Sequence, residues 1–208
     1  MAVVDVLNCA GNKVSEASLS DYVFNIPVKK NILHDVVRSQ LAAKREGTAS
    51  SKSRSMIQGS TRKLYRQKGT GNSRAGSKKS PLRKGGGVIF GPSPKSYSIK
   101  LPKKVKKLAL KMALSSKLQN DSLKIIDEFS LKTFKTKDFV SIMKTLNIFN
   151  LLIVSDKDNA NLMLSSKNVP NVKVIQTNGL NVYDVLKYKN LILEQPSIEN
   201  IDKRLGAK

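Results

Sequence analysis

The middle third of the chain contains no acidic residue. Residues 47–120 carry 19 lysines and arginines and not one aspartate or glutamate, whereas the other 134 residues carry 19 basic and 15 acidic side chains. This acid-free segment supplies most of the formal net charge of +23. A solvated surface normally mixes both signs, because a large field of one sign opposes compact folding. The segment therefore predicts a polyanionic partner.

The first half of this segment lacks the residues for a hydrophobic core. Large apolar or aromatic side chains are sparse between residues 47 and 84, as at Met56, Ile57, Leu64 and Tyr65. Glycine is frequent instead, at Gly59, Gly69, Gly71 and Gly76 and in the run 85–87. Glycine lets backbone N–H groups approach phosphate oxygens, while lysine and arginine supply charge. The composition predicts a segment that is disordered alone and becomes ordered on RNA.

Two other interpretations of the segment are weaker. A flexible linker would seldom carry charge of one sign only, and a membrane-binding helix would need an aligned apolar face. Four side chains also fit base stacking, in which a ring or a guanidinium lies on a nucleobase: Arg62, Tyr65, Arg66 and Arg74. RNA binding would use both the charge and these side chains.

Outside this segment the chain alternates between strand and helix patterns. Apolar runs predict strands at residues 3–7, 123–127, 151–154, 172–176 and 191–193. Helical spacing predicts helices at 31–45, from Pro102, and at 136–146, 159–166, 181–186 and 197–205. This alternation favours a Rossmann-like three-layer α/β/α domain with a mainly parallel central sheet. We expect a discontinuous domain of residues 1–46 and 96–208, interrupted by an extended RNA-binding loop of residues 47–95, named the basic loop.

Two of the predicted helices have a recognisable apolar face. In residues 31–45 the apolar side chains recur at helical spacing, at Ile32, Val36, Val37 and Leu41, and His34 is expected to be structural. After Pro102, the side chains expected to face the core are Val105, Leu108 and Met112. The lysines of that helix are expected on the outside, where they can contact RNA: Lys103, Lys104, Lys106, Lys107 and Lys111.

Patterns for catalysis are lacking. A single cysteine, Cys9, and a single histidine, His34, exclude an internal disulfide, a clustered zinc site and a catalytic triad. The strand at 151–154 is followed by Ser-Asp-Lys-Asp rather than the glycine-rich turn of pyrophosphate-binding sites. Asp156 and Asp158 could pair on a metal, but acidic residues between a strand and a helix more often cap the helix. We expect no catalytic residue, no cofactor and no metal.

Two alternative classes can be weighed on the same observations. A nucleotide-dependent enzyme is favoured only by the architecture, and a DNA-packaging protein only by the charge, because no helix-turn-helix pattern is present. Apolar runs never exceed four residues, as at 151–154, so the sequence predicts no membrane span and no secretory signal. The protein is expected in the cytoplasm.

A series of motifs matches a known family. In the basic loop they are Tyr65-Arg66-Gln67-Lys68-Gly69-Thr70-Gly71, Arg74, Gly76-Ser77 and Ser80-Pro81. They continue as Gly85-Gly86-Gly87-Val88, Phe90-Gly91-Pro92, Pro94, Tyr97, Leu101-Pro102-Lys103-Lys104, Leu108-Ala109-Leu110 and Ala113-Leu114-Ser115. Arg45, Gly47-Thr48, Lys52-Ser53-Arg54 and Asn181-Val182-Tyr183-Asp184 extend the match to nearly the whole chain. The chain resembles the family of bacterial large-subunit ribosomal protein number four, the universal L-four family.

The resemblance implies a structural constituent of the large ribosomal subunit that binds 23S ribosomal RNA, supports assembly and is not an enzyme. It implies an α/β domain on the solvent side and a loop that lines the nascent-peptide exit tunnel. The loop tip would lie opposite ribosomal protein number twenty-two, beside the nascent peptide, and the protein would be a monomer within the ribosome. An excursion of about 45 residues, out and back, can reach about 70 Å at roughly 3.3 Å per residue, far enough for this role.

Charge and resemblance together assign two sets of residues. The expected RNA-binding residues are Lys52, Arg54, Arg62, Lys63, Tyr65, Arg66, Gln67, Lys68, Gly69, Thr70, Gly71, Arg74, Lys78, Lys79, Arg83, Lys84, Lys103 and Lys104. The expected tunnel tip is Arg62, Lys63, Arg66, Gln67, Lys68 and Gly69.

Five positions depart from the family pattern. Relatives usually have a proline where Leu64 stands, an arginine where Asn72 stands, and a tryptophan at each of the positions of Tyr65 and Arg83. Tyr65 can still stack over a smaller area, and the guanidinium of Arg83 can stack or bind phosphate. Met56 stands where a glutamate is usual, so a salt bridge of relatives is not expected here.

Overall fold

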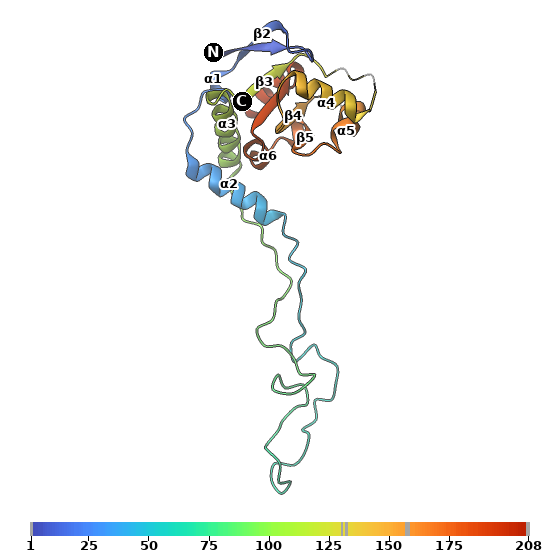
Figure 1. Ribbon diagram of the computed structural model, residues 1–208. Coiled ribbons are helices and arrows are strands. Elements are labelled where there is room, and N and C mark those ends of the chain that lie inside the picture. The colour runs from blue at the N-terminus through green and yellow to red at the C-terminus, as the bar shows by residue number, and fades with distance from the viewer. Residues whose placement is uncertain (1, 130, 132, 157–158, 207–208) are drawn as a thin grey trace. The chain divides into compact units, whose positions relative to one another are not determined.

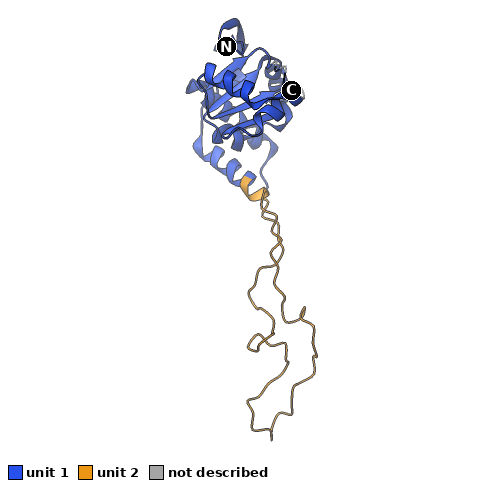
Figure 2. Ribbon diagram, turned by 45° about the vertical axis from the view of Figure 1, so that its right-hand side comes forward, with its two compact units in different colours: residues 1–40, 100–208 blue, residues 41–99 orange. Residues whose placement is uncertain are grey.

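The computed structural model describes residues 2–129, 131, 133–156 and 159–206. The chain divides into two compact units, one of residues 1–40 and 100–208 and one of residues 41–99 (Figure 2). They are named the globular unit and the loop unit, and the loop unit contains the whole basic loop. All regular strands lie in the globular unit, among the residues that the structure describes.

A six-stranded sheet forms the centre of the globular unit (Figure 1). Its strands are β1 (Ala2–Leu7), β2 (Lys13–Leu19), β3 (Leu123–Ile126), β4 (Leu151–Ser155), β5 (Val172–Gln176) and β6 (Asn190–Glu194). They lie in the order β2-β1-β3-β6-β4-β5. The β1–β2 pair is antiparallel, and the four other neighbouring pairs are parallel.

Seven α-helices accompany the sheet in the described part of the chain. They are α1 (Asp21–Phe24), α2 (Lys30–Ala43), α3 (Lys103–Gln119), α4 (Thr136–Thr145), α5 (Ala160–Ser166), α6 (Val182–Lys187) and α7 (Gln195–Leu205). A short 3₁₀ turn, η1 (Thr177–Gly179), precedes α6. None of the helices so described is both long and apolar enough to cross a membrane.

Side chains of β4 alternate between two hydrophobic cores, as the two-residue period of a strand requires. Leu152 and Val154 belong to a core that includes residues of α2, α3, α6 and α7. Leu151 and Ile153 belong to a second core that includes residues of α4 and α5. All four side chains are completely buried. The apolar run is therefore a strand covered on both faces, and the unit has three layers.

The predicted α/β class with a mainly parallel sheet is confirmed. The parallel strands lie in the order β1-β3-β6-β4-β5, so the last strand of the chain inserts between the second and the third of the parallel set. A doubly wound Rossmann sheet instead grows outward in both directions from its first strand. The Rossmann-like detail of the prediction is not confirmed.

Strand β2, helix α1 and the short turn η1 were not predicted from the sequence. Strand β2 lies at the sheet edge, pairs only with β1 and has a single fully buried residue, Leu19. Its sequence therefore lacks the apolar run by which the other strands were predicted. Helix α1 has only four residues, too few for a helical period to show.

The outward placement predicted for Lys111 is wrong. Its side chain is buried, with 6% exposed, and its ammonium lies 3.3 Å from the centre of the Tyr22 ring in α1. The contact is a cation–π interaction, which offsets part of the cost of removing the charge from water. In α2, Leu33 and Val36 are the buried apolar residues, whereas Leu41 is exposed. His34 is also exposed rather than part of the core.

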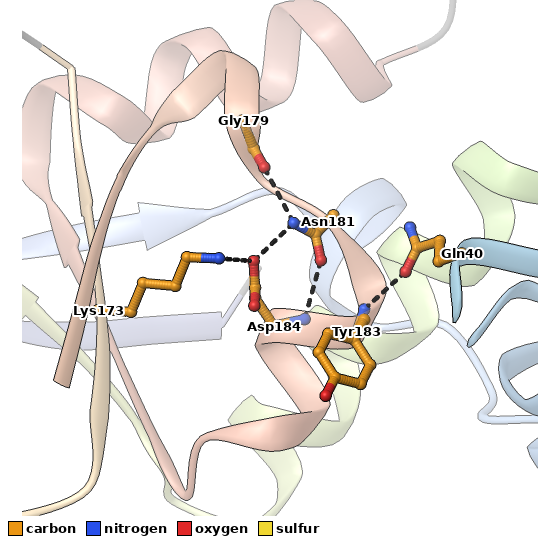
Figure 3. A network of polar contacts seen from close by, with 6 residues as sticks. All are labelled: Gln40, Lys173, Gly179, Asn181, Tyr183 and Asp184. Atoms are coloured by element: carbon orange, nitrogen blue, oxygen red, sulfur yellow. Dashed lines mark hydrogen bonds and ion pairs between the residues drawn. The ribbon is translucent and has the colours of Figure 1, made fainter. Parts of the chain in front are cut away.

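A polar network fixes the start of α6 (Figure 3). Asn181 caps the helix by accepting a hydrogen bond from Asp184 N at 2.8 Å, and its Nδ2 donates to the carboxylate of Asp184 at 2.7 Å. Lys173 of β5 forms an ion pair with the same carboxylate at 2.6 Å. From α2, Gln40 Oε1 accepts a hydrogen bond from Tyr183 N at 2.9 Å. Since Gln40 is the last residue before the loop unit, this contact ties that end of the globular unit to α6.

Candidate nucleic-acid interface

The basic loop consists of an outgoing and a returning leg held together by backbone hydrogen bonds. Lys95 N donates to Gly47 O at 3.2 Å, Ser51 N to Pro92 O at 2.9 Å and Val88 N to Lys52 O at 3.0 Å. All residues from 44 to 102 are described, and no helix or regular strand forms among them. The legs are thus an irregular two-stranded ribbon (Figure 2).

Close approach of the two legs depends on glycine at defined points. At Gly47, with φ +67°, a β-carbon would lie 2.0 Å from the carbonyl oxygen of Lys95. At Gly87 a β-carbon would lie 2.4 Å from the backbone nitrogen of Arg54. Real atoms do not approach so closely, so neither position accepts a side chain without moving a leg. Tyr97 packs near the base of the ribbon, with the Arg45 guanidinium 4.0 Å from its ring centre.

The predicted tip is closed by short-range contacts. Leu64 N donates to Gly76 O at 3.1 Å, and the Tyr65 hydroxyl donates to Ser73 O. Arg66 Nη2 donates to Gly69 O at 3.0 Å, and Lys63 Nζ donates to the side-chain oxygen of Gln67. These contacts bring most of the predicted tip residues together in one turn. The hydroxyl of Tyr65 is used within the loop, and its ring is half-buried.

The predicted RNA-binding cations are almost all in contact with solvent. The exposed ones are Lys52, Arg54, Arg62, Lys63, Arg66, Lys68, Arg74, Lys78, Arg83, Lys84, Lys103 and Lys104, whereas Lys79 is half-buried. Among the uncharged members, Gln67, Gly69 and Gly71 are exposed and Thr70 is half-buried. Because the basic loop contains no carboxylate, none of its cations can be neutralised within it. The loop therefore presents a field of one sign to its surroundings.

Helix α3 of the globular unit begins with a second group of cations. Lys103, Lys104, Lys106 and Lys107 are exposed in its first two turns, and its first turn holds no acidic residue. A helix N-terminus already carries partial positive charge, so lysines there oppose the helix dipole. An external anion would relieve this repulsion, which makes the start of α3 a second candidate for phosphate contact.

Acidic residues gather at the carboxyl ends of β3, β4 and β6. Asp127, Glu128, Asp156 and Glu194 line one cleft there. Glu194 accepts hydrogen bonds from Ser155 Oγ at 2.7 Å and from Asp156 N at 3.3 Å. Among the described residues no three histidine, cysteine or acidic side chains form a group that could hold a metal ion.

The capping role predicted for the acidic pair after β4 is wrong for Asp156. The residue that caps α5 is Asn159, whose Oδ1 accepts a hydrogen bond from Leu162 N at 3.1 Å. The side chain of Asp156 instead accepts a hydrogen bond from Asn200 of α7. Asp158, the other member of the pair, lies outside the described residues.

Two exposed apolar side chains of the loop are missing from the predicted site. Phe90 is 98% exposed and Leu82 is 94% exposed. Neither belongs to a predicted element, because Leu82 has no apolar neighbour and Phe90 ends a run of only three apolar residues, 88–90. The signal that could have found them is a large apolar residue inside a glycine-rich segment that has no core of its own.

A covered α/β domain with a long acid-free loop fits a structural nucleic-acid-binding protein better than an enzyme. Residues 17–204 match the family described as "Ribosomal protein L4/L1 family". The large ribosomal subunit protein uL4 of Desulforapulum autotrophicum is 64% identical over 204 residues, which cover 98% of this chain and 99% of the relative. The protein of that name from Desulfosudis oleivorans is 54% identical over 99% of this chain and 100% of the relative.

The same protein of Lawsonia intracellularis is 47% identical, again over 99% of this chain and the whole of the relative. The chain belongs to the ribosomal protein L4/L1 family. Members of this family are ribosomal structural proteins, so the prediction that the chain is not an enzyme is confirmed.

Proposed function

We propose that the basic loop binds 23S ribosomal RNA, supports assembly of the large subunit and lines the nascent-peptide exit tunnel. As a family member the protein is a structural constituent of the large ribosomal subunit, located in the cytoplasm as part of the ribosome. The observation that carries the proposal is an acid-free stretch, residues 47–120, in which most cations are exposed, Lys79, Lys111 and Lys117 excepted. Those cations need external anions, and RNA phosphates supply them.

The outgoing leg and the segment that leads into the returning leg both contribute to the proposed RNA contact. Lys52 and Arg54 lie on the outgoing leg, and Arg83 and Lys84 lie just before the returning leg. Since hydrogen bonds hold the legs together, the cations are carried on one narrow ribbon that nucleotides can surround. Phosphate contacts of this kind fix position, and base contacts add sequence information. The start of α3, with Lys103 and Lys104, extends the phosphate contact to the globular unit.

The tip is proposed to line the tunnel wall. Its residues are Arg62, Lys63, Arg66, Gln67, Lys68 and Gly69, which all are exposed. The neighbouring partner there would be ribosomal protein number twenty-two, and the nascent peptide would pass the tip. The protein acts in this proposal as a monomer within the ribosome, with the globular unit on the solvent side.

The RNA-binding part is tested by the salt dependence of affinity. Full-length protein is titrated onto 23S ribosomal RNA folded in magnesium at several salt concentrations. If about ten phosphates are neutralised, log affinity falls with log salt concentration at a slope of about −7 to −9. A slope near −2 for the full-length protein would overturn the proposal.

The matched variant replaces residues 47–95 with a short glycine-serine linker. Compared with the full-length protein, its slope of log affinity against log salt concentration should be less steep by about five or more. Its affinity near physiological salt should be lower by about 1000-fold. Double-stranded DNA serves as competitor. Equal affinity for DNA and for folded ribosomal RNA would favour a DNA-packaging function instead.

The tunnel part is tested by crosslinking. Cys9→Ser removes the native thiol, and Lys68→Cys then carries a photoreactive label in ribosomes stalled on a radioactive nascent chain. We expect the label to crosslink to the nascent chain, whereas the same label at Glu199→Cys in the globular unit should not. Equal crosslinking from both positions, or none from Lys68→Cys, contradicts the tunnel assignment.

A further inference from the structure

The returning leg of the ribbon contains a bulge. Ser51 N bonds to Pro92 O at 2.9 Å, and Val88 N bonds to Lys52 O at 3.0 Å. Two adjacent residues of the outgoing leg thus pair with two residues of the returning leg that are four positions apart. Residues 89–91 are extra in this register, so the returning leg must bulge between these two hydrogen bonds.

The neck of the bulge is fixed by close packing. At Gly91 a β-carbon would lie 1.9 Å from Ser51 Oγ, and at Gly87 it would lie 2.4 Å from Arg54 N. Ser51 Oγ also donates to Pro92 O at 3.1 Å. The two legs are therefore in direct contact on both sides of the bulge. The register cannot slip by one residue without forcing a side chain into that contact.

Phe90 is the residue that the bulge exposes. It is 98% exposed, its neighbour Ile89 is 67% exposed, and Val88 is half exposed. Because the Phe90 ring stays in water, it adds no buried apolar surface that could stabilise the loop itself. Its ring has both faces free to receive a flat partner.

The charge around the neck decides what kind of partner can cover the ring. Lys52 and Arg54 stand opposite the neck and are exposed. No carboxylate occurs anywhere in the segment, so an apolar protein surface seated there would leave these cations desolvated and unpaired. A nucleotide provides a flat π-face for the ring and a phosphate for the cations in one molecule.

We propose that the 88–92 bulge presents Phe90 as a stacking platform for an unpaired nucleobase of the large-subunit ribosomal RNA. This inference rests on the proposed RNA-binding function and adds a binding mode to it. Lysine and arginine contribute through phosphate, with a steep dependence on salt, whereas a stacked base contributes a term that salt hardly changes. The two contributions are therefore separable in one titration.

The first measurement compares Phe90→Ala with the full-length wild-type protein on folded 23S ribosomal RNA. We expect the affinity to fall by about 5- to 100-fold at every salt concentration, with the slope against log salt unchanged. Phe90→Leu should recover little of the loss and Phe90→Tyr most of it, because the partner is a π-face. The matched control is Phe149→Ala, which removes a 65% exposed phenylalanine from the globular unit and should leave the affinity unchanged.

The second measurement uses fluorescence, because the chain has no tryptophan. Phe90→Trp and Phe149→Trp each introduce a single reporter into the full chain. When RNA binding is saturated, the emission from position 90 should be quenched by the stacked base, and the emission from position 149 should not. Sedimentation of the complex verifies in the same samples that RNA is bound.

The outcomes separate this inference from the function on which it rests. If the wild-type protein does not bind RNA, or binds it with only a weak dependence on salt, both the RNA-binding function and the stacking proposal are contradicted. If it binds with the steep slope but Phe90→Ala binds equally well, or the reporter at position 90 is not quenched, only the stacking proposal falls. An unquenched, blue-shifted emission from position 90 in assembled subunits would mean that a neighbouring protein, and not a base, buries this side chain. This result would also overturn the stacking proposal.

Discussion

The globular unit and the loop unit use the same types of side chain in opposite ways. Phe139 of α4 is completely buried, whereas Phe90 of the basic loop is 98% exposed. The globular unit buries its apolar residues in two hydrophobic cores, whereas the basic loop has no hydrophobic core. Burial within the chain therefore stabilises only the globular unit, and the basic loop depends on what surrounds it.

Charge follows the same division. In the globular unit, Lys173 pairs with Asp184 at 2.6 Å, and Lys13 pairs with both Asp5 and Glu16. The basic loop has no acidic residue to pair with. The globular unit therefore neutralises much of its charge internally, while the basic loop leaves its charge to a partner. Substitutions of buried or paired residues in the globular unit should accordingly affect stability, and substitutions in the basic loop should affect binding.

The largest effect on stability is expected when a buried phenylalanine of the core is replaced by alanine. Phe139→Ala should lower the free energy of unfolding by about 3–4 kcal/mol, because it removes a fully buried ring and leaves a cavity. Phe90→Ala should change it by less than about 0.5 kcal/mol, as expected for an exposed side chain. Urea unfolding followed by far-ultraviolet circular dichroism measures both. Comparable losses for the two variants would mean that the basic loop has a hydrophobic core of its own, contrary to the difference between the two units.

A smaller effect is expected from the buried carboxylate of α6. Asp184 is 3% exposed and accepts hydrogen bonds from Lys173 and Asn181. Asp184→Asn keeps the shape but removes the charge that pairs with Lys173, so we expect a loss of about 2 kcal/mol. The control is Glu199→Gln in α7, whose 3.7 Å pair with Lys203 is largely exposed and should contribute less than about 0.5 kcal/mol. Equal losses would show that the pairing in the globular unit is not set by burial.

The sequence predicts the buried strands of the globular unit well and its edge strand poorly. Strand β5 was predicted with its observed bounds, and β4 was predicted to within one residue. Both are apolar runs between helices, and burial on both faces imposes that pattern directly. The edge strand β2 was missed because most of its side chains face water, which leaves no apolar signal in the sequence KVSEASL.

The remaining errors concern contacts between distant segments. Lys111 was placed outside because helical spacing describes one helix, and its partner Tyr22 belongs to another element. In the candidate site, the charge and glycine content of the loop followed from composition alone. The bulge at residues 88–92 did not, because it depends on which residue of the returning leg meets Ser51 and which meets Lys52. Register between irregular legs leaves no local trace in a sequence.

The smallest effect is expected where the globular unit fails to neutralise a charge. In α7, Oδ1 of Asp202 is buried and has no hydrogen-bond partner among the residues that the structure describes, and burial raises the pKa of this carboxyl above its usual value. A raised pKa in the folded state means that the protonated form is preferred there, so this group favours folding most at low pH and loses that contribution as pH rises through the folded pKa. Its place near the carboxyl end of the helix adds an unfavourable interaction of the ionised form with the helix dipole.

Asp202→Asn should therefore increase stability at neutral pH, by about 0.5 kcal/mol after allowance for partial exposure to solvent. The gain should shrink as pH falls through the range in which the wild-type carboxyl becomes protonated, because the two proteins then carry the same charge at this position. Thermal unfolding of both proteins between about pH 3.5 and pH 7 measures the difference. Glu199→Gln on the same helix should show no such pH-dependent gain. If Asp202→Asn is instead less stable at neutral pH, the carboxylate has a stabilising partner in solution, and the globular unit neutralises its charge more completely than the structure indicates.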